Sequence, residues 1–266
     1  MLLINRFITW ASFHVPQSGP IRNLGKAVLK FFYPRYYFKP VLEGRELSEI
    51  FTEHYESNYW GSKESVSGYG STLKFTANLR RELPGVFEKC SVQTILDAPC
   101  GDYNWFRHVG RDGDMQYIGA DIVSELIESN QEKYGNSNTR FIRLDITKDP
   151  LPKADLWMCR DALFHLSHED IALAFENLMK SKVKYVLFTS HHECTENKDI
   201  LSGDFRPLNL ELAPFDLPKP ILAIDDWIKG FEPRRMCLWE TKSLSKIIPA
   251  ISDRVLNAKA KEHKLA

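Results

Sequence analysis

From residue 91 onward, short apolar runs alternate with amphipathic segments. Five runs rich in β-branched and aromatic residues predict strands at 94–98, 116–121, 140–145, 154–160 and 184–190. Between them, residues 123–134 have helical character, and residues 168–180 repeat apolar side chains at helical spacing. A last strand is predicted at 236–240. This alternation predicts an α/β fold with a mainly parallel sheet and right-handed crossovers.

Three segments fall outside the alternation. Residues 24–32 place apolar side chains on one face and lysines opposite, which predicts a short amphipathic helix. Residues 55–72 are rich in Ser, Gly and aromatic residues, so we expect either a mobile lid that excludes water or a plain connecting loop. Residues 191–222 contain five Pro or Gly residues and predict a long irregular insertion, which is either functional or a surface excursion.

Polar residues follow each predicted strand, at the edge where ligands bind in open α/β sheets. In chain order they are Asp97, Gly101 and Asp102, then Asp121, then Asp145, then Arg160 and Asp161. Gly101 lets the backbone approach a ligand closely. Asp121, twenty residues later, is placed to accept hydrogen bonds from a ribose diol.

The turn after the first strand separates two kinds of cofactor. A dinucleotide loop needs three glycines to admit a pyrophosphate, and only Gly101 is present here. Asp97 and Asp102 flank it, and their carboxylates repel phosphate. The turn therefore favours a cationic cofactor without phosphate, such as S-adenosylmethionine.

Several motifs in order carry a family resemblance. ILDAPCGDYNW (95–105) resembles the first motif of class I S-adenosylmethionine-dependent methyltransferases, in the form of a bacterial polysaccharide-biosynthesis subgroup. YIGADI (117–122), RLDIT (143–147) and CRDALFHLS (159–167) match later motifs, as do 55–72 upstream and 203–218 downstream. The resemblance covers roughly 45–240 and implies a Rossmann-like fold, with a mainly parallel seven-stranded sheet and helices on both faces. The usual glycine-rich loop is replaced here by Cys100 and Asp102.

The resemblance also implies roles for individual residues. Asp97 and Gly101 shape the pocket for the methionine moiety, Asp121 holds the ribose, and Asp145 with the backbone of Ile146 faces the adenine. For the carboxylates, a turn-forming or capping role is the alternative. The full predicted cofactor-binding set is Asp97, Pro99, Gly101, Asp121, Ile122, Asp145, Ile146, Arg160, Trp60 and Gly61.

A sugar hydroxyl is a poor nucleophile when neutral, so a base near the fourth strand end is expected. We predict His165 as general base and Asp161 as its helper, because a helical turn would place residues four apart on one face. Alternatively, His165 caps the next helix. His191 and His192 are rival bases. The predicted substrate-binding residues are His191, His192, Arg206 and Asn209. We predict no metal site, although a divalent ion at the His191–His192 pair stays open.

The expected function is O-methyl transfer from S-adenosylmethionine to a sugar, in bacterial glycan or surface-polysaccharide synthesis. The alternatives are a methyltransferase acting on a small non-sugar metabolite, a lipid or a protein, and a methyltransferase-fold binding module without turnover.

Composition is that of an ordinary globular protein. The 266 residues include 35 Lys+Arg and 35 Asp+Glu, with 43% hydrophobic residues. Five cysteines without a CxxC pair argue against a disulfide framework or a zinc site. No run of 18 apolar residues predicts a membrane span, and Arg6 interrupts the apolar start, so we expect a cytoplasmic protein.

The zero net charge conceals an asymmetry. Residues 1–40 hold six Lys or Arg, no Asp or Glu, and nine of the 32 aromatic residues. This basic arm is interpreted as a peripheral membrane anchor at the inner face, a docking surface for a partner or a second copy, or an element packed on the body. Nucleic acid is not expected as a partner, because the body is acidic. The predicted divisions are an arm (1–44), a helical and lid segment (45–90), a methyltransferase domain (91–250) and a tail (251–266).

Overall fold

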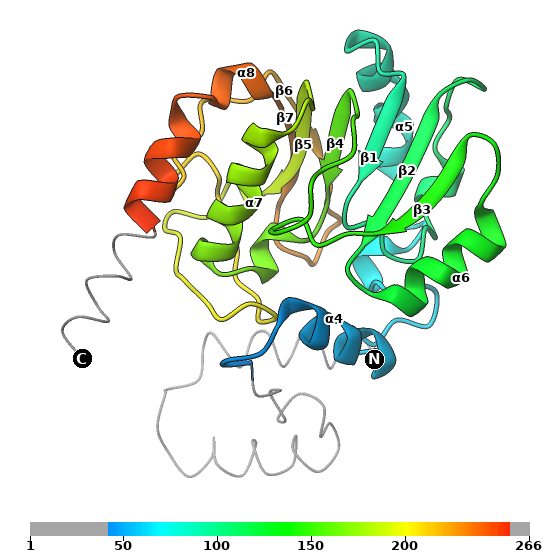
Figure 1. The fold of residues 1–266 in the computed structure, drawn as a ribbon, viewed down its shortest axis with the longest axis horizontal. Helices are drawn as coiled ribbons and strands as arrows, with labels where there is room; N and C mark the ends of the chain where they lie inside the picture. Colours follow the sequence, from blue (N-terminus) through cyan, green and yellow to red (C-terminus); the bar gives the residue numbers. More distant parts are fainter. Residues whose placement is uncertain (1–41, 256–266) are drawn as a thin grey trace. The chain divides into compact units, whose positions relative to one another are not determined.

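The structure, a computed structural model, describes residues 42–255 (Figure 1). The helix predicted at 24–32, nearly all of the basic arm and most of the predicted tail lie outside these residues. The described chain begins with helix α4 (Leu47–Glu56). An extended segment containing the short 3-10 turn η1 (Tyr69–Ser71) then leads to α5 (Ala77–Lys89).

A seven-stranded sheet forms the centre of the fold, in the order β3-β2-β1-β4-β5-β7-β6. The strands are β1 (Thr94–Asp97), β2 (Gln116–Asp121), β3 (Thr139–Arg143), β4 (Leu156–Cys159), β5 (Tyr185–Ser190), β6 (Leu222–Asp225) and β7 (Arg235–Glu240). The first five are mutually parallel, whereas β7 runs antiparallel to both β5 and β6. The predicted mainly parallel, seven-stranded sheet is confirmed. Only β6 escaped prediction, because it is a short edge strand with a single buried side chain.

Helices cover both faces of the sheet, as predicted. Successive strand residues point to opposite faces, so Leu156 and Met158 join one hydrophobic cluster while Trp157 and Cys159 join the other. Helix α7 (His168–Lys180) and the helical residues 247–255 pack on the Trp157 face. Helix α5 packs on the opposite face, behind the sheet in Figure 1. The shorter helices are α6 (Ser124–Tyr134), α8 (Thr241–Leu244) and the 3-10 turns η2 (Phe106–His108) and η3 (Leu163–His165).

Residues 191–221 contain no helix or strand, yet this part of the described chain is no loose excursion. Leu208, Leu210 and Phe215 are fully buried in the cluster on the α7 face. The backbone is also satisfied locally, since the Leu210 N–H donates to the Ser190 hydroxyl at 3.0 Å. The irregular insertion is therefore part of the core.

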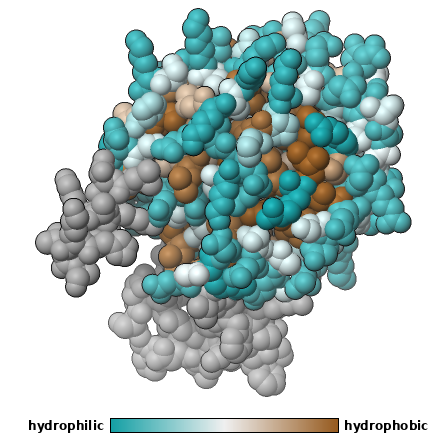
Figure 2. All heavy atoms as spheres, viewed as in Figure 1, coloured by the Kyte–Doolittle hydropathy of each residue, from teal (hydrophilic) through white to brown (hydrophobic). Residues whose placement is uncertain are grey.

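Hydrophilic residues cover most of the face shown in Figure 2, and hydrophobic residues show in smaller areas between them. None of the helices described is both long and apolar enough to cross a membrane.

Candidate active site

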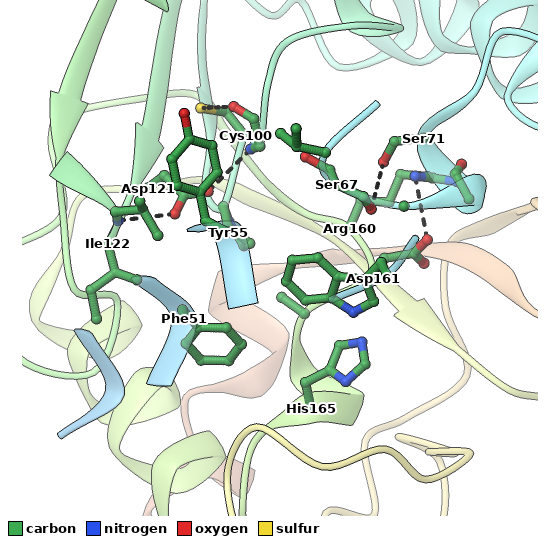
Figure 3. Close-up of a pocket in the computed structure, with 18 of the residues that line it drawn as sticks. Phe51, Tyr55, Ser67, Ser71, Cys100, Asp121, Ile122, Arg160, Asp161 and His165 are labelled. Atoms are coloured by element: carbon green, nitrogen blue, oxygen red, sulfur yellow. Dashed lines mark hydrogen bonds and ion pairs between the residues drawn. The ribbon is translucent and has the colours of Figure 1, made fainter. Parts of the chain in front are cut away.

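A cavity of about 390 Å³ lies at the carboxyl ends of the parallel strands, with α4 forming one wall (Figure 3). In this view Asp121 and Ile122 lie on one side, and Arg160, Asp161 and His165 lie on the other. The predicted residues that line it are Trp60, Asp97, Pro99, Gly101, Asp121, Ile122, Asp145, Ile146, Arg160, Asp161 and His165. Gly61 is not among the lining residues. We call the region at the ends of β1, β2 and β3 the carboxylate half, and the region around Arg160, Asp161 and His165 the paired half.

The carboxylate half contains buried acids without ion-pair partners. Tyr117 donates its hydroxyl proton to Asp97 at 2.7 Å, and the N–H groups of Gly101 and Val123 donate to Asp121 at 3.1 and 3.2 Å. Burial raises the pKa of Asp97 to about 7 and that of Asp121 to about 6. Among the described residues, no Lys, Arg or His lies within ion-pair distance of these two carboxylates.

Asp145 follows β3 and is fixed by its own turn. The Thr147 N–H and hydroxyl both donate to one oxygen of Asp145, at 2.9 and 2.6 Å. The neighbouring Ile146 lines the cavity, and its carbonyl accepts a hydrogen bond from Asn177 on α7 at 3.0 Å. Hydrogen bonds thus fix both residues of this pair, which line the same cavity as Asp121, and their contact with adenine stays a prediction.

The turn after β1 is covered by residues 62–73, which we call the strap. Gly101 has φ +56°, and a Cβ there would lie 2.2 Å from the Ser67 hydroxyl oxygen. The Ser65 hydroxyl and the Val66 N–H donate to Asp102 at 2.9 and 3.0 Å. The region predicted as a lid therefore does lie against the cavity, which residues 66–71 help to line. Its mobility stays a prediction.

The paired half is built from four charged side chains. Arg160 donates from Nε and Nη2 to the two oxygens of Asp226, at 2.8 and 3.1 Å, and both side chains are almost completely buried. Arg234 donates from Nη2 to Asp161 at 2.7 Å. Burial opposes ionisation of Asp161, but the charges of Arg160 and Arg234 outweigh it and hold its pKa below the usual value. This carboxylate therefore stays ionised.

His165 is held in one tautomer. Its Nδ1 lies 2.8 Å from the Asp204 carbonyl oxygen. Because a carbonyl only accepts hydrogen bonds, we assign the proton to Nδ1, which leaves the lone pair on Nε2. Burial lowers the pKa of His165 to about 4, so the ring is neutral near pH 7. A neutral imidazole with a free Nε2 lone pair can accept a proton.

The expected pairing of Asp161 with His165 does not form. Only Leu163–His165 adopt a helical turn, and Asp161 has φ +52°, outside the helical region. The two residues therefore do not share a helix face, and Asp161 bonds Arg234 instead. The Asp204 carbonyl takes the role of orienting His165.

The four residues predicted to bind substrate, His191, His192, Arg206 and Asn209, do not line the cavity. The Asn209 amide serves the insertion itself, donating to the Cys194 carbonyl and accepting from Glu211 N–H at 3.1 and 3.0 Å. His191 Nδ1 accepts the Leu208 N–H at 3.2 Å. Arg206 is buried and donates to the Leu163 carbonyl at 3.3 Å, behind η3. His192 is partly buried one residue beyond His191. His191 and Asn209 therefore satisfy backbone groups of the insertion itself, whereas Arg206 Nε and Nη2 and His192 Nδ1 are buried without a hydrogen-bond partner among the described residues.

Several lining residues were missed by sequence reasoning: Phe51, Tyr55, Tyr69, Phe205, Phe231 and Arg234. Arg234 had a usable signal. Because β7 is antiparallel, its first residue, Arg235, pairs with Ser190 at the end of β5. The residue before β7 therefore lies at the edge where the parallel strands end. The aromatic residues come from α4, the strap and loops, where no periodic pattern marks them.

Within residues 42–255, no group of three or more His, Cys, Asp or Glu side chains is arranged to hold a metal ion. The possibility of an ion at His191 and His192 therefore gains no support from the described part of the chain. Independence from metal stays a prediction.

Comparison with known proteins places this site in context. Residues 95–181, from β1 to the end of α7, match the family model described as a methyltransferase domain. No curated protein matches the chain in sequence. The structure described as PigF with SAH is 14% identical, with a TM-score of 0.50, covering 82% of this chain and 72% of that one.

Human N-acetylserotonin methyltransferase in complex with SAM is 15% identical, with a TM-score of 0.48, over 74% of this chain. The match spans 60% of that longer protein. Magnesium protoporphyrin IX methyltransferase from Synechocystis with bound SAH is 10% identical, with a TM-score of 0.49, over 72% of this chain and 94% of that one. At such identities the likeness concerns the fold alone. The chain has the Rossmann-like class I methyltransferase fold, and the match over 95–181 supports a class I S-adenosylmethionine-dependent methyltransferase.

Proposed function

We propose that this protein transfers a methyl group from S-adenosylmethionine to a hydroxyl of a sugar, in bacterial glycan or surface-polysaccharide synthesis. One observation carries the cofactor assignment: Asp97 and Asp121 are buried at the cavity, and no Lys, Arg or His among residues 42–255 lies within ion-pair distance of them. Buried carboxylates are costly unless they are compensated. A ligand with positive charge supplies the missing compensation.

The residues present fit this cofactor. Asp121 has two oxygens fixed by backbone N–H groups and keeps lone pairs that face the cavity, where ribose hydroxyls can donate to them. Asp97 is placed near the Gly101 turn, where an amino group or a sulfonium would stabilise its ionised form. Asp145 and Ile146 lie further along the same half and would contact the base. When bound, S-adenosylmethionine supplies a methyl group already activated by the positive sulfur.

The protein's own contribution is alignment and proton removal. His165 presents a neutral Nε2 and lies at the cavity wall, so it can accept the proton of an acceptor hydroxyl as that oxygen attacks. Its pKa of about 4 makes it a weak base, so proton transfer is expected to accompany carbon–oxygen bond formation. Trp60 packs near His165, with ring centres 6.1 Å apart, and helps to exclude water.

The choice of a sugar acceptor rests on the sequence resemblance and on the aromatic residues that line the paired half. Small metabolites, lipids and proteins are the competing acceptors. A binding module without turnover is less favoured, because the His165 tautomer is set for proton acceptance.

Two measurements test the proposal in sequence. Calorimetric titration with S-adenosylmethionine should show binding to the full chain, and no binding would remove the cofactor assignment. Incubation with nucleotide sugars, free glycans and non-sugar alcohols, followed by mass spectrometry, should give products 14 Da heavier only with sugars, as expected for one added methylene. Products with non-sugar alcohols alone would replace the sugar with another acceptor class.

A further inference from the structure

The paired half of the cavity contains charged side chains that the removal of a proton by His165 does not require. Asp226 has no exposed side-chain surface and is occupied by the two hydrogen bonds from Arg160. Asp161 is different, because 19% of its side chain is exposed and it lies at the cavity wall. Asp161 is therefore the acidic group of this half that a ligand meets.

The position of Asp161 is fixed from three sides. Arg234 Nη2 lies 2.7 Å from its Oδ2, and Arg160 Nη1 lies 3.4 Å from the same oxygen. The backbone N–H of Asp161 donates to the Thr189 hydroxyl at 2.9 Å. The Thr189 hydroxyl also lies 3.4 Å from Asp161 Oδ1. A carboxylate offers about four lone-pair positions, so this fixed group retains room for a hydroxyl donor from a ligand.

The strap closes over this ion pair. Arg160 Nη2 donates to the Gly70 carbonyl at 2.8 Å. A Cβ on Gly70 would lie 2.9 Å from Asp161 Oδ2 and 3.0 Å from Arg234 Nη2. A Cβ there would force one of these side chains to shift, so the glycine lets the strap backbone lie directly against the ion pair.

The local charges cancel. Two arginines, Arg160 and Arg234, face two carboxylates, Asp161 and Asp226, and each cation has an anionic partner. Among the described residues that line the cavity, Arg160 and Arg234 are the only Lys or Arg, so no lining cation is left over for a carboxylate or phosphate on a ligand. An anionic ligand would also approach the ionised Asp161 and be repelled.

Aromatic side chains complete the walls. Tyr69 and Phe231 stack with ring centres 5.2 Å apart and an angle of 10°, and both are about two-fifths exposed at the cavity. Arg234 lies over the ring of Phe75, 4.6 Å from its centre. A flat apolar surface next to a fixed hydrogen-bond acceptor matches a ring with C–H groups on one face and hydroxyls at its edge.

Resting on the proposed function, we infer that the paired half binds an uncharged, polyhydroxylated ring. Asp161 accepts a hydrogen bond from one ring hydroxyl, and the Tyr69–Phe231 pair packs on the C–H face. Arg234 positions Asp161 and does not bind an anionic group of the ring that is methylated. This sets the ligand apart from uronic acids and from rings phosphorylated near the reacting hydroxyl.

The test measures binding, so that it does not depend on turnover. The full chain, saturated with S-adenosylhomocysteine, is titrated with methyl hexopyranosides and with the methyl glycosides of the corresponding uronic acids, which keep a free carboxylate, and binding is followed by ligand-observed NMR. We expect the neutral ring of at least one pair to bind about tenfold or more tightly than its uronate, since the ionised Asp161 repels the carboxylate of the uronate and no lining cation compensates for it. Equal or tighter binding of every uronate, or no binding of any neutral ring, overturns the inference.

Single substitutions test whether Asp161 and Phe231 account for this binding preference. Asp161→Asn should weaken binding of the neutral ring about tenfold and reduce the preference over the uronate, with cofactor affinity within twofold of wild type. Phe231→Ala should weaken both rings. The matched controls are Asp225→Asn, in the exposed Asp225–Arg235 ion pair, and Trp227→Ala, an exposed aromatic residue that does not line the cavity.

Two outcomes separate this inference from the proposed function. If sugars are methylated but Asp161→Asn leaves both binding and preference unchanged, the inference fails while the function stands. If the protein binds no S-adenosylmethionine, the function fails.

If Asp161→Asn lowers the melting temperature more than Asp225→Asn does, Phe231→Ala tests the inference in its place. Unchanged ring binding in that variant then counts against the inference.

Discussion

The two halves of the cavity treat charge in opposite ways. In the carboxylate half, Asp97 and Asp121 are buried with no ion-pair partner in the described part of the chain, and burial raises their pKa values to about 7 and about 6. In the paired half, Asp161 lies against two arginines, and its pKa falls below the usual value. The first arrangement is completed by a cationic ligand, whereas the second is already neutral. The difference shows that the number of acids in a site says little until their partners are known.

The largest expected effect concerns the base. His165→Ala should lower kcat about 100-fold or more, because a positioned base contributes about 10²–10⁴-fold, while the cofactor dissociation constant stays unchanged. Steady-state kinetics and calorimetry together check this. Near-normal kcat in a folded variant would mean that the paired half aligns the acceptor without removing its proton.

Removing an acid from the carboxylate half should weaken binding of the cofactor. Asp121→Ala should weaken S-adenosylmethionine binding about 10- to 100-fold, because hydrogen bonds to a charged group contribute about 1.5–3 kcal/mol. Asp121→Asn keeps the shape of the side chain if the alanine variant does not fold. Asp114→Asn, at an exposed position, is the control for a lost charge. Unchanged affinity in both Asp121 variants would contradict the ribose assignment.

The contrast in pKa predicts a pH dependence. Binding a cation favours the ionised forms of Asp97 and Asp121, so it lowers their pKa values and releases protons. Affinity for S-adenosylmethionine should therefore rise about tenfold or more from pH 5 to pH 8, through the window set by pKa values of about 6 and about 7. Calorimetry in buffers of different ionisation enthalpy measures the proton release. A flat profile would show that these carboxylates stay protonated when the cofactor is bound.

The close approach of the strap can be tested through stability. Gly101→Ala should lower the free energy of unfolding by about 1–3 kcal/mol, because φ is +56° and the new Cβ meets Ser67 at 2.2 Å. Gly113→Ala is the matched control, since nothing lies within 4 Å of its Cβ position. Denaturant unfolding of both variants gives the comparison. Equal stabilities would mean that the strap moves aside at little cost.

The smallest expected effect is that of chelation. Residues 42–255 contain no group of three or more side chains arranged to hold a metal ion. EDTA should therefore leave methyl transfer unchanged within error. Loss of activity that Mg²⁺ or Mn²⁺ restores would contradict this expectation.

Sequence reasoning predicted the central sheet well, because each buried parallel strand leaves a continuous apolar run. Strand β2 and helix α7 were predicted with the bounds that the structure shows. The carboxylate half was equally accessible, since its residues follow strands directly and share one edge of the sheet. Those residues depend on local chain geometry, which the local sequence encodes.

The paired half was predicted less well, because its partners are distant in the sequence. Asp161 was assigned to a neighbour four residues away, whereas its partner Arg234 is 73 residues away. Arg206 and Asn209 carry the right chemistry for a sugar, but Asn209 bonds backbone groups of the insertion and Arg206 donates to the Leu163 carbonyl in η3. Residue type alone does not tell whether a polar side chain serves a ligand or its own loop.

The reversed direction of β7 has a consequence for how such a protein changes specificity. If β7 ran parallel to β5, the residue before it would begin at the opposite edge, about 20 Å away for six residues at roughly 3.3 Å each. Because β7 is reversed, the loop between β6 and β7, which lies outside the matched stretch 95–181, reaches the edge of the sheet where the cavity lies. Arg234, Phe231 and Tyr69 all lie outside that stretch. We expect that substitutions in these loops change which acceptor is bound, while the residues within 95–181 that line the carboxylate half stay the same.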